Sequence, residues 1–133
     1  SILVGIMSQK GNIHLNIGKP LTSEEIAEAA QCDKNDRYQK IRHAVDLRVI
    51  EGYKLWKNNY IAYDIANHSF KYSDQYDRAD QERFVAYMEH QLDTVEPSIN
   101  REDLRRIFLD IYANPVITKE LLQKEKVTGS ILL

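Results

Sequence analysis

The chain has 133 residues, of which 43% are hydrophobic and 29% charged, and this balance is typical of a folded globular domain rather than a disordered or fibrous protein. Cys32 is its single cysteine, which excludes an intrachain disulfide and a cysteine-based zinc site and favours a reducing, cytoplasmic location. No apolar run is long enough to span a membrane, and no signal-peptide pattern is present. Because the chain begins without Met inside an apolar run, we expect a fragment of a longer protein.

The first predicted element is a short strand at residues 12–17, where Ile13, Leu15 and Ile17 alternate with polar residues. Residues 2–7 either pair with this strand as a hairpin or form the end of a helix that begins upstream. A single strand leaves its backbone groups unpaired, so it needs a neighbour. We therefore expect sheet-edge pairing through Ile13, Leu15 and Ile17, within a hairpin, with a second copy of the chain, or with a sheet outside it.

The rest of the chain predicts helices, so the expected fold is mainly α, with four to five helices and a short N-terminal strand or hairpin. Thr22 and Glu25 form a capping box that begins a short helix to about residue 31. A longer helix is predicted over residues 34–51, ending at Gly52. Its apolar stripe, which predicts a buried face, consists of Tyr38, Ile41, Val45 and Val49.

Further helices are predicted in the second half of the chain. One or two turns are expected at residues 61–67, followed by polar turns over 68–77. A helix over residues 78–94 should bury Phe84, Val85, Met88 and Leu92. Asn100 is predicted to cap a helix with an apolar face of Leu104, Ile107, Phe108 and Ile111. Asn114 and Pro115 predict the start of another helix to about residue 123, with fraying beyond it.

A group of aromatic residues and lysines follows the predicted helix over 34–51. Aromatic rings beside lysines are typical of proteins that touch the headgroups of an anionic membrane. The possible membrane-contact residues are Tyr53, Lys54, Trp56, Lys57 and Tyr60. The alternative is a loop whose Trp56 and Tyr60 fold back onto the helices.

Motifs for catalysis, cofactors and metals were not found, so we predict no catalytic residue, cofactor site or metal site in this chain. His43 with Asp46 and His90 with Asp93 each offer two metal ligands on one helix face, but a site needs three or four. The sequence contains no nucleophile elbow, phosphate-binding loop or dinucleotide fingerprint.

The sequence "KGNIHLNIGKPL" at residues 10–21 resembles the end of the glycerophospholipid acyltransferase domain, the glycerol-3-phosphate and 1-acylglycerol-3-phosphate acyltransferase family. In that family, the corresponding strand belongs to the main mixed sheet. Three further segments look like the helical C-terminal extension of such enzymes in Bacteroidetes-type bacteria: "NNYIAYDI" at 58–65, "FVAYMEHQLDTV" at 84–95 and "LDIYANPV" at 109–116. The resemblance thus implies a remnant sheet edge at residues 1–21 and a helical C-terminal domain at 22–133.

The family transfers a fatty acyl group from acyl-CoA or acyl carrier protein to a glycerol phosphate acceptor. It uses a His-x-x-x-x-Asp motif, in which the histidine acts as the general base. No histidine in this chain has an aspartate five positions on, since those positions hold Lys19, Arg48, Ser73 and Val95. The resemblance therefore implies a bacterial protein portion that is inactive alone. Its partners would be the upstream catalytic domain and an anionic membrane surface, on the inner face of the membrane.

Two other classes of function remain open. Residues 21–64 also resemble a winged helix-turn-helix, with Arg37, Lys40 and Arg42 on the second helix and a basic hairpin-like wing carrying Lys54 and Lys57. Against nucleic acid as a partner stand ten acids and five bases over residues 74–110 and a pI near 6.1. The third class is a helical protein-interaction domain that docks through an apolar face.

Overall fold

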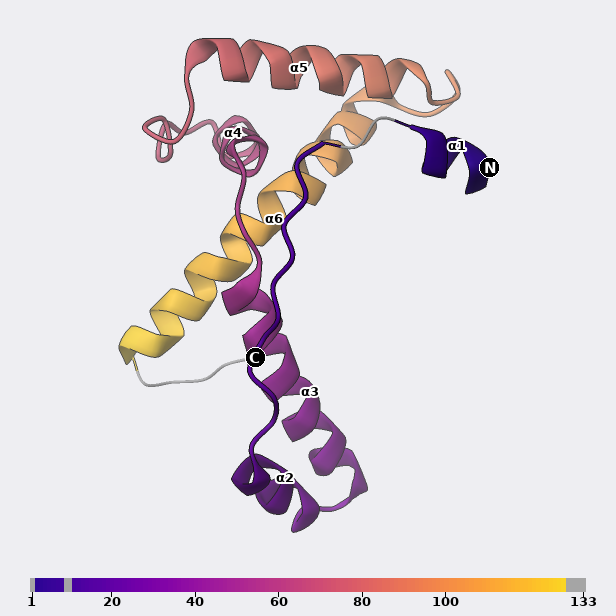
Figure 1. The fold of residues 1–133 in the computed structure, drawn as a ribbon. Helices are drawn as coiled ribbons and strands as arrows, with labels where there is room; N and C mark the ends of the chain where they lie inside the picture. The colour runs from indigo at the N-terminus through magenta and orange to yellow at the C-terminus, as the bar shows by residue number, and fades with distance from the viewer. Residues whose placement is uncertain (1, 9–10, 129–133) are drawn as a thin grey trace. The chain divides into compact units, whose positions relative to one another are not determined.

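The computed structural model describes residues 2–8 and 11–128, and over these residues the protein is mainly helical, as predicted, with six helices (Figure 1). The chain divides into two compact units, unit 1 (Ser1–Lys54) and unit 2 (Leu55–Leu133). Each unit is described separately below. The predicted division at residue 21 refers to a parent domain and stays a prediction.

Unit 1 contains helices α1 (Ile2–Met7), α2 (Ser23–Ala30) and α3 (Lys34–Gly52). The predicted capping box is confirmed, because the hydroxyl of Thr22 accepts from the amide of Glu25 and the Glu25 carboxylate accepts from the amide of Thr22. Asp33 caps α3 through a single bond, because its carboxylate accepts from the amide of Asp36. A turn over residues 31–33 then allows α2 to pack against α3.

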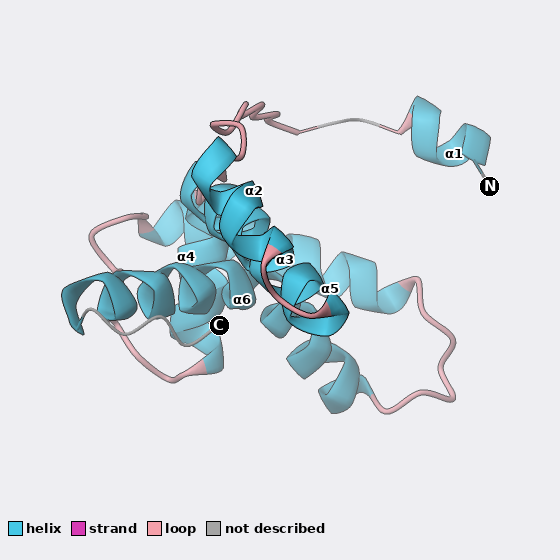
Figure 2. Ribbon diagram, turned by 90° about the horizontal axis from the view of Figure 1, so that it is seen from below, coloured by secondary structure: helices cyan, strands magenta, loops and turns pink. Residues whose placement is uncertain are grey.

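The predicted N-terminal strand or hairpin is wrong for the residues that the structure describes. Residues 2–7 are helical, which agrees with the alternative reading of this segment, and residues 11–22 form neither helix nor strand (Figure 2). A hairpin needs two extended segments, and α1 removes one of them. Without a second strand in the described chain, residues 12–17 have no ladder to join.

The predicted buried stripe of α3 is also wrong. Tyr38, Val45 and Val49 are exposed by 63%, 42% and 59%, while Ile41 is half-buried. Among the described residues of unit 1, Ala29 is the single buried side chain. Amphipathic periodicity identified a helix correctly here, but unit 1 contains too few neighbours to cover its apolar face.

Unit 2 contains helices α4 (Lys57–Ala66), α5 (Arg78–Asp93) and α6 (Arg101–Thr128), and it encloses an apolar core. Helix α4, longer than predicted, packs most extensively against α6. The predicted burial of Phe84, Met88 and Leu92 is confirmed, and Val85 packs at the edge of the core. The ring of Phe84 contacts those of Phe108 and Tyr112, with centroid distances of 6.0 and 5.4 Å.

Helix α6 continues through Pro115, so the predicted start of a new helix at this residue is wrong. A proline inside a helix removes one backbone hydrogen bond. Here, side chains satisfy neighbouring carbonyls: Asn59 donates to the carbonyl of Tyr112 at 2.9 Å, and Thr118 donates to that of Asn114 at 2.9 Å. Ala113 and Val116 are buried, and this packing favours a continuous helix over a break.

Candidate interaction site

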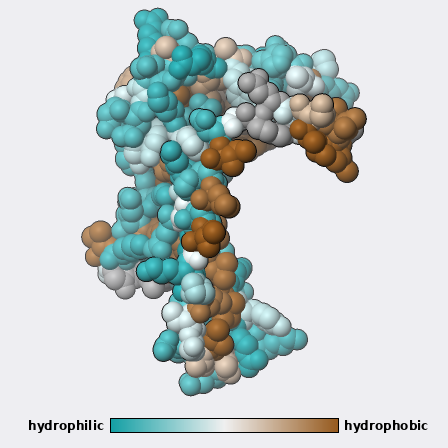
Figure 3. Space-filling model, viewed as in Figure 1, coloured by the Kyte–Doolittle hydropathy of each residue, from teal (hydrophilic) through white to brown (hydrophobic). Residues whose placement is uncertain are grey.

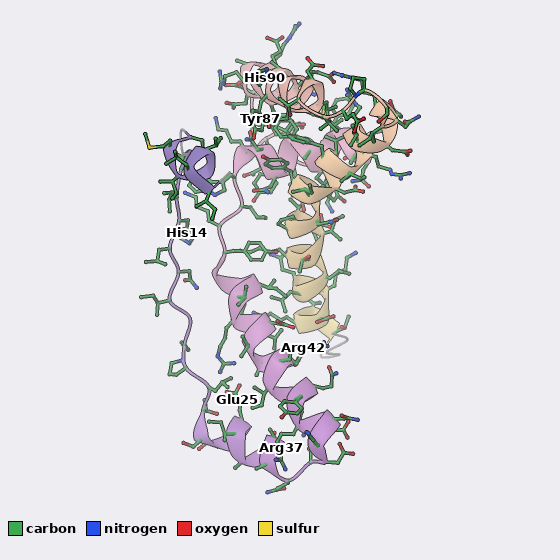
Figure 4. The ribbon with its side chains drawn as sticks, turned by 90° about the vertical axis from the view of Figure 1, so that its right-hand side faces the viewer. His14, Glu25, Arg37, Arg42, Tyr87 and His90 are labelled. Carbon is green, nitrogen blue, oxygen red and sulfur yellow. The ribbon has the colours of Figure 1, made fainter. Side chains whose placement is uncertain are left out.

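The predicted sheet-edge residues lie in the part of unit 1 that precedes α2. Ile13, Leu15 and Ile17 are exposed by 82%, 82% and 89%, and Figure 3 shows apolar surface along this part of the chain. We call residues 11–18 the extended segment. Figures 1 and 4 draw it as a stretched chain. The segment therefore has the shape and side-chain alternation of a strand although it is paired with none among the described residues.

The polar side chains of the extended segment lie against the C-terminal end of α3. The Nε2 of His14 donates to the carbonyl of Gly52 at 3.3 Å. That carbonyl belongs to the last turn of α3, where no further helical amide is available to it. Asn16 lies so close to Gly52 that a Cβ atom at residue 52 would be 1.8 Å from the Asn16 Nδ2. Glycine is thus required at residue 52 for this contact.

Arg48 holds the end of the same stretch. Its Nε donates to the carbonyl of Lys19 at 2.9 Å and its Nη2 to that of Pro20 at 3.3 Å. The Nη2 also bridges both carboxylate oxygens of Glu25, at 3.1 and 2.8 Å. The amide of Thr22, followed by Arg48, lowers the pKa of Glu25. One arginine of α3 therefore binds both α2 and residues 19 and 20, which follow the extended segment.

The predicted membrane-contact residues divide between the two units. Tyr53 and Lys54 follow α3 in unit 1, whereas Trp56 precedes α4 and Lys57 and Tyr60 lie within it. Lys57 pairs with the buried carboxylate of Asp80 at 2.6 Å, and the ring of Tyr60 contacts that of Tyr72 at 5.0 Å. Both side chains thus have structural roles in unit 2. Membrane contact stays a prediction.

The aspartates of the two His-x-x-Asp pairs lie beside arginines. Asp46 lies 3.9 Å from Arg42, and Asp93 accepts from Arg101 at 2.7 Å. Within residues 2–8 and 11–128, no cluster of three or more His, Cys, Asp or Glu side chains is arranged to hold a metal ion. No helix in those ranges has the length and apolarity to cross a bilayer.

The winged helix-turn-helix alternative predicts a hairpin-like wing after α3, and the structure contradicts this part. Residues 57–66 form helix α4 instead. Arg37, expected to face DNA, donates through Nη2 to the carbonyls of Ala30 and Cys32, at 3.2 and 3.3 Å. It closes the C-terminal end of α2 and is therefore occupied within the protein.

Sequence patterns did not identify Arg48, His14 and Gly52 as interacting residues, because their partners are far apart in the chain. They also missed Asp64, which is buried within the last turns of α4 and accepts from the hydroxyls of Ser69 and Tyr76 at 2.6 and 2.9 Å, and from the amide of Tyr72 at 3.0 Å. The aromatic residues and the polar loop near Asp64 were the signal in the sequence that could have identified it. These bonds fix the loop between α4 and α5.

A cleft of about 740 Å³ lies in unit 2 between that loop and the first half of α6. Its lining includes Phe70, Arg105 and Arg106. Arg105 pairs with Glu89 at 2.7 Å, and Arg106 lies 3.4 Å from Asp103. Both cations are thus already neutralised, and the cleft does not indicate a particular ligand.

Comparisons of the chain with family models, curated proteins and solved structures find no match. Functional inference therefore rests on the residues and their geometry.

Proposed function

We propose that this chain is the C-terminal, non-catalytic portion of a bacterial acyltransferase of phospholipid synthesis. The parent enzyme would transfer a fatty acyl group from acyl-CoA or acyl carrier protein to a glycerol phosphate acceptor. The observation that carries the proposal is the extended segment: it has the alternation of a strand, exposes its apolar side chains and has no strand partner in the described chain. A sheet edge in an upstream catalytic domain would supply that partner.

The distribution of polar groups supports a structural role for the chain. The carboxylates of both His-x-x-Asp pairs lie beside arginines, and the buried carboxylate of Asp64 accepts from loop donors. General acid–base catalysis needs a titratable group positioned toward a substrate. The chemistry of the parent enzyme would thus come from residues before Ser1.

The decisive experiment uses the longest polypeptide that the gene encodes. We expect its upstream part to contain a His-x-x-x-x-Asp motif and the purified protein to transfer acyl groups from acyl-CoA or acyl carrier protein to glycerol 3-phosphate or 1-acylglycerol 3-phosphate. The 133-residue chain should show no transfer. Replacement of the motif histidine by alanine is the control for contaminating activity. A full gene product that lacks both motif and transfer activity would overturn the proposal.

Membrane contact near Trp56 forms a separable part of the proposal. Trp56 and Tyr53 are half-buried. We expect Trp56→Ala to reduce sedimentation of the chain with anionic vesicles, since an indole ring favours the headgroup region. Tyr87→Ala, at an exposed aromatic residue on α5, is the matched control. Equal sedimentation of wild type and Trp56→Ala would remove membrane contact and leave the acyltransferase assignment intact.

A further inference from the structure

Helix α6 has an apolar face that lies exposed on the side away from its buried residues. Its side chains are exposed by 37–63%. The four residues, which we call the α6 stripe, are Ile107, Ile111, Ile117 and Leu121. Because successive residues of a helix are turned by about 100°, the stripe spans only about 120° around the helix axis. An apolar stripe of this width is typical of a helix that packs against another element.

The α6 stripe is arranged symmetrically about Asn114. Ile111 and Ile117 lie three residues before and after it. Ile107 and Leu121 lie seven residues before and after it. Two antiparallel copies of α6, related by a two-fold axis at Asn114, would thus place Ile107 of each copy opposite Leu121 of the other. Ile111 and Ile117 would flank the axis on its two sides. The stripe is therefore complementary to itself.

The polar groups at the centre of the α6 stripe also suit a second copy. The side chain of Asn114 is exposed, and no described residue forms a hydrogen bond with it. Pro115 has no amide, so the carbonyl of Ile111 loses the donor that a regular helix provides. The side-chain amide of Asn114 in a second copy can donate to that carbonyl or to its own counterpart. A single asparagine within an apolar helix interface fixes the alignment of the two helices.

Charged residues at the ends of the α6 stripe complement each other in the same arrangement. Asp103 lies eleven residues before Asn114 and Lys124 lies ten residues after it, and both are exposed. Antiparallel packing would place Asp103 of one copy beside Lys124 of the other, and the symmetry forms this pair twice. Asp103 also lies 3.4 Å from Arg106 of its own helix. Exposed pairs contribute little to affinity, but they favour the antiparallel orientation over the parallel one.

We propose that α6 forms the interface of a homodimer, in which the α6 stripes of two copies pack antiparallel about a two-fold axis at Asn114. An anionic bilayer fits this face less well, because the exposed carboxylates of Asp103 and Asp110 lie along its N-terminal half. The stripe is about 21 Å long. It is therefore smaller than the roughly 800 Å² per partner that stable interfaces bury, and the dimer should dissociate on dilution. The proposal uses residues of α6 only and does not depend on the acyltransferase assignment.

Cysteine cross-linking tests the position of the axis. Asn114→Cys in a Cys32→Ser background should form an intermolecular disulfide under mild oxidation, because a residue on the axis meets its own counterpart. Gln123→Cys in the same background is the control, since residue 123 is exposed on the opposite side of α6. Non-reducing electrophoresis measures the cross-linked fraction. Absence of the Asn114→Cys dimer, or equal cross-linking of the two variants, would overturn the proposal.

Sedimentation equilibrium tests the stripe itself. With increasing concentration, the mass of the wild-type chain should rise from 15.5 kDa toward twice that value. Ile111→Asp should weaken dimerisation at least about 100-fold, because the interface would bury two unpaired carboxylates. Val127→Asp, at an exposed apolar residue of α6 outside the stripe, should dimerise like the wild type. Circular dichroism establishes that each variant keeps its helices.

Two results of this measurement would overturn the proposal. One is a wild-type chain that stays monomeric at all concentrations. The other is a dimer that persists in Ile111→Asp and is lost in Leu15→Asp, which would identify the extended segment as the interface.

The cysteine variants in the longest polypeptide that the gene encodes complete the test. A disulfide at residue 114 in that protein would support the proposal. A disulfide in the 133-residue chain that is absent from the longer protein would overturn it, because another part of that protein would then cover the α6 stripe. Acyl transfer by the longer protein is measured separately, so the dimer and the proposed function stand or fall independently.

Discussion

Unit 2 is held together mainly by its core, whereas unit 1 is held together mainly by polar side chains. Ile61, Phe84, Met88 and Val116 in unit 2 are almost completely shielded from water. Among the described residues of unit 1, Ala29 alone is buried, and Arg48, Glu25 and His14 make the connections between segments. Buried apolar area is the largest favourable term in folding. Unit 2 therefore has its own source of stability, whereas unit 1 leaves many of its apolar side chains exposed.

The largest expected effect is in the core of unit 2. Phe84→Ala should lower the free energy of unfolding of unit 2 by about 3–5 kcal/mol, because it removes a buried ring and leaves a cavity. Urea unfolding followed by circular dichroism measures this change. Ile107→Ala, on an exposed part of α6, should cost less than about 0.5 kcal/mol. Similar costs for the two variants would mean that the core does not stabilise unit 2.

The next effect concerns the buried carboxylate of Asp64. Asp64→Asn should cost about 1–3 kcal/mol, because an amide group cannot accept from all the loop donors that the carboxylate serves. Burial, followed by the hydrogen bond to Asp64, raises the pKa of Tyr76 to about 12. The substitution should bring that pKa closer to 10 in a titration of tyrosine absorbance. Asp74→Asn, at an exposed residue, is the control, and an unchanged Tyr76 titration would contradict the predicted role.

A smaller effect is expected in unit 1. Arg48→Ala should lower local stability by about 1–2 kcal/mol, because charge-assisted hydrogen bonds to Glu25 and to the carbonyls of Lys19 and Pro20 are lost. Faster amide exchange at the start of α2 would report this change while α5 and α6 keep their protection. Arg42→Ala, on the exposed surface of the same helix, should have almost no effect. If unit 1 had a substantial core of its own, Arg48→Ala would also be nearly silent.

The smallest expected effect is on how the stability of unit 2 changes with pH under acidic conditions. The hydrogen bond from Lys57, with the Asp77 amide, lowers the pKa of Asp80 to about 2. The pKa of Asp80 is lower in the folded protein than its unfolded value of about 3.9. The ionised Asp80 carboxylate therefore contributes its full stabilisation above about pH 3.9, and this stabilisation is lost as the pH falls toward 2. Thermal unfolding between pH 2 and 5 should show a weaker acid dependence in Asp80→Asn than in Asp110→Asn. Equal pH dependence of thermal unfolding in the two variants would contradict the stabilising role of the Asp80 carboxylate.

Local signals in the sequence predicted the helices well. The capping box of Thr22 and Glu25, the cap at Asn100 and the apolar period around Phe84 act within a few residues, and each is confirmed. Pro115 was misread as a helix start, because packing between α4 and α6 and the side chain of Asn59 outweighed its local preference. Proline signals describe the backbone alone and carry no information on such tertiary partners.

The candidate site was only partly predictable from the sequence. Alternation at residues 12–17 predicted a strand, but the described chain forms none there, because alternation carries no information on whether a partner strand belongs to the same chain. The apolar period of α3 likewise predicted that Tyr38, Val45 and Val49 are buried, but all three are exposed in the structure. A pattern reports that a face is suited to a nonpolar neighbour and leaves open where that neighbour resides.

The contacts of Arg48 have a consequence for sequence tolerance. On the extended stretch it binds main-chain oxygens of residues 19 and 20, rather than their side chains. Any residue pair that keeps the backbone path can therefore occupy those two positions without disturbing the anchor. A reporter group attached to the side chain at either position should therefore leave the hydrogen bonds of Arg48 intact.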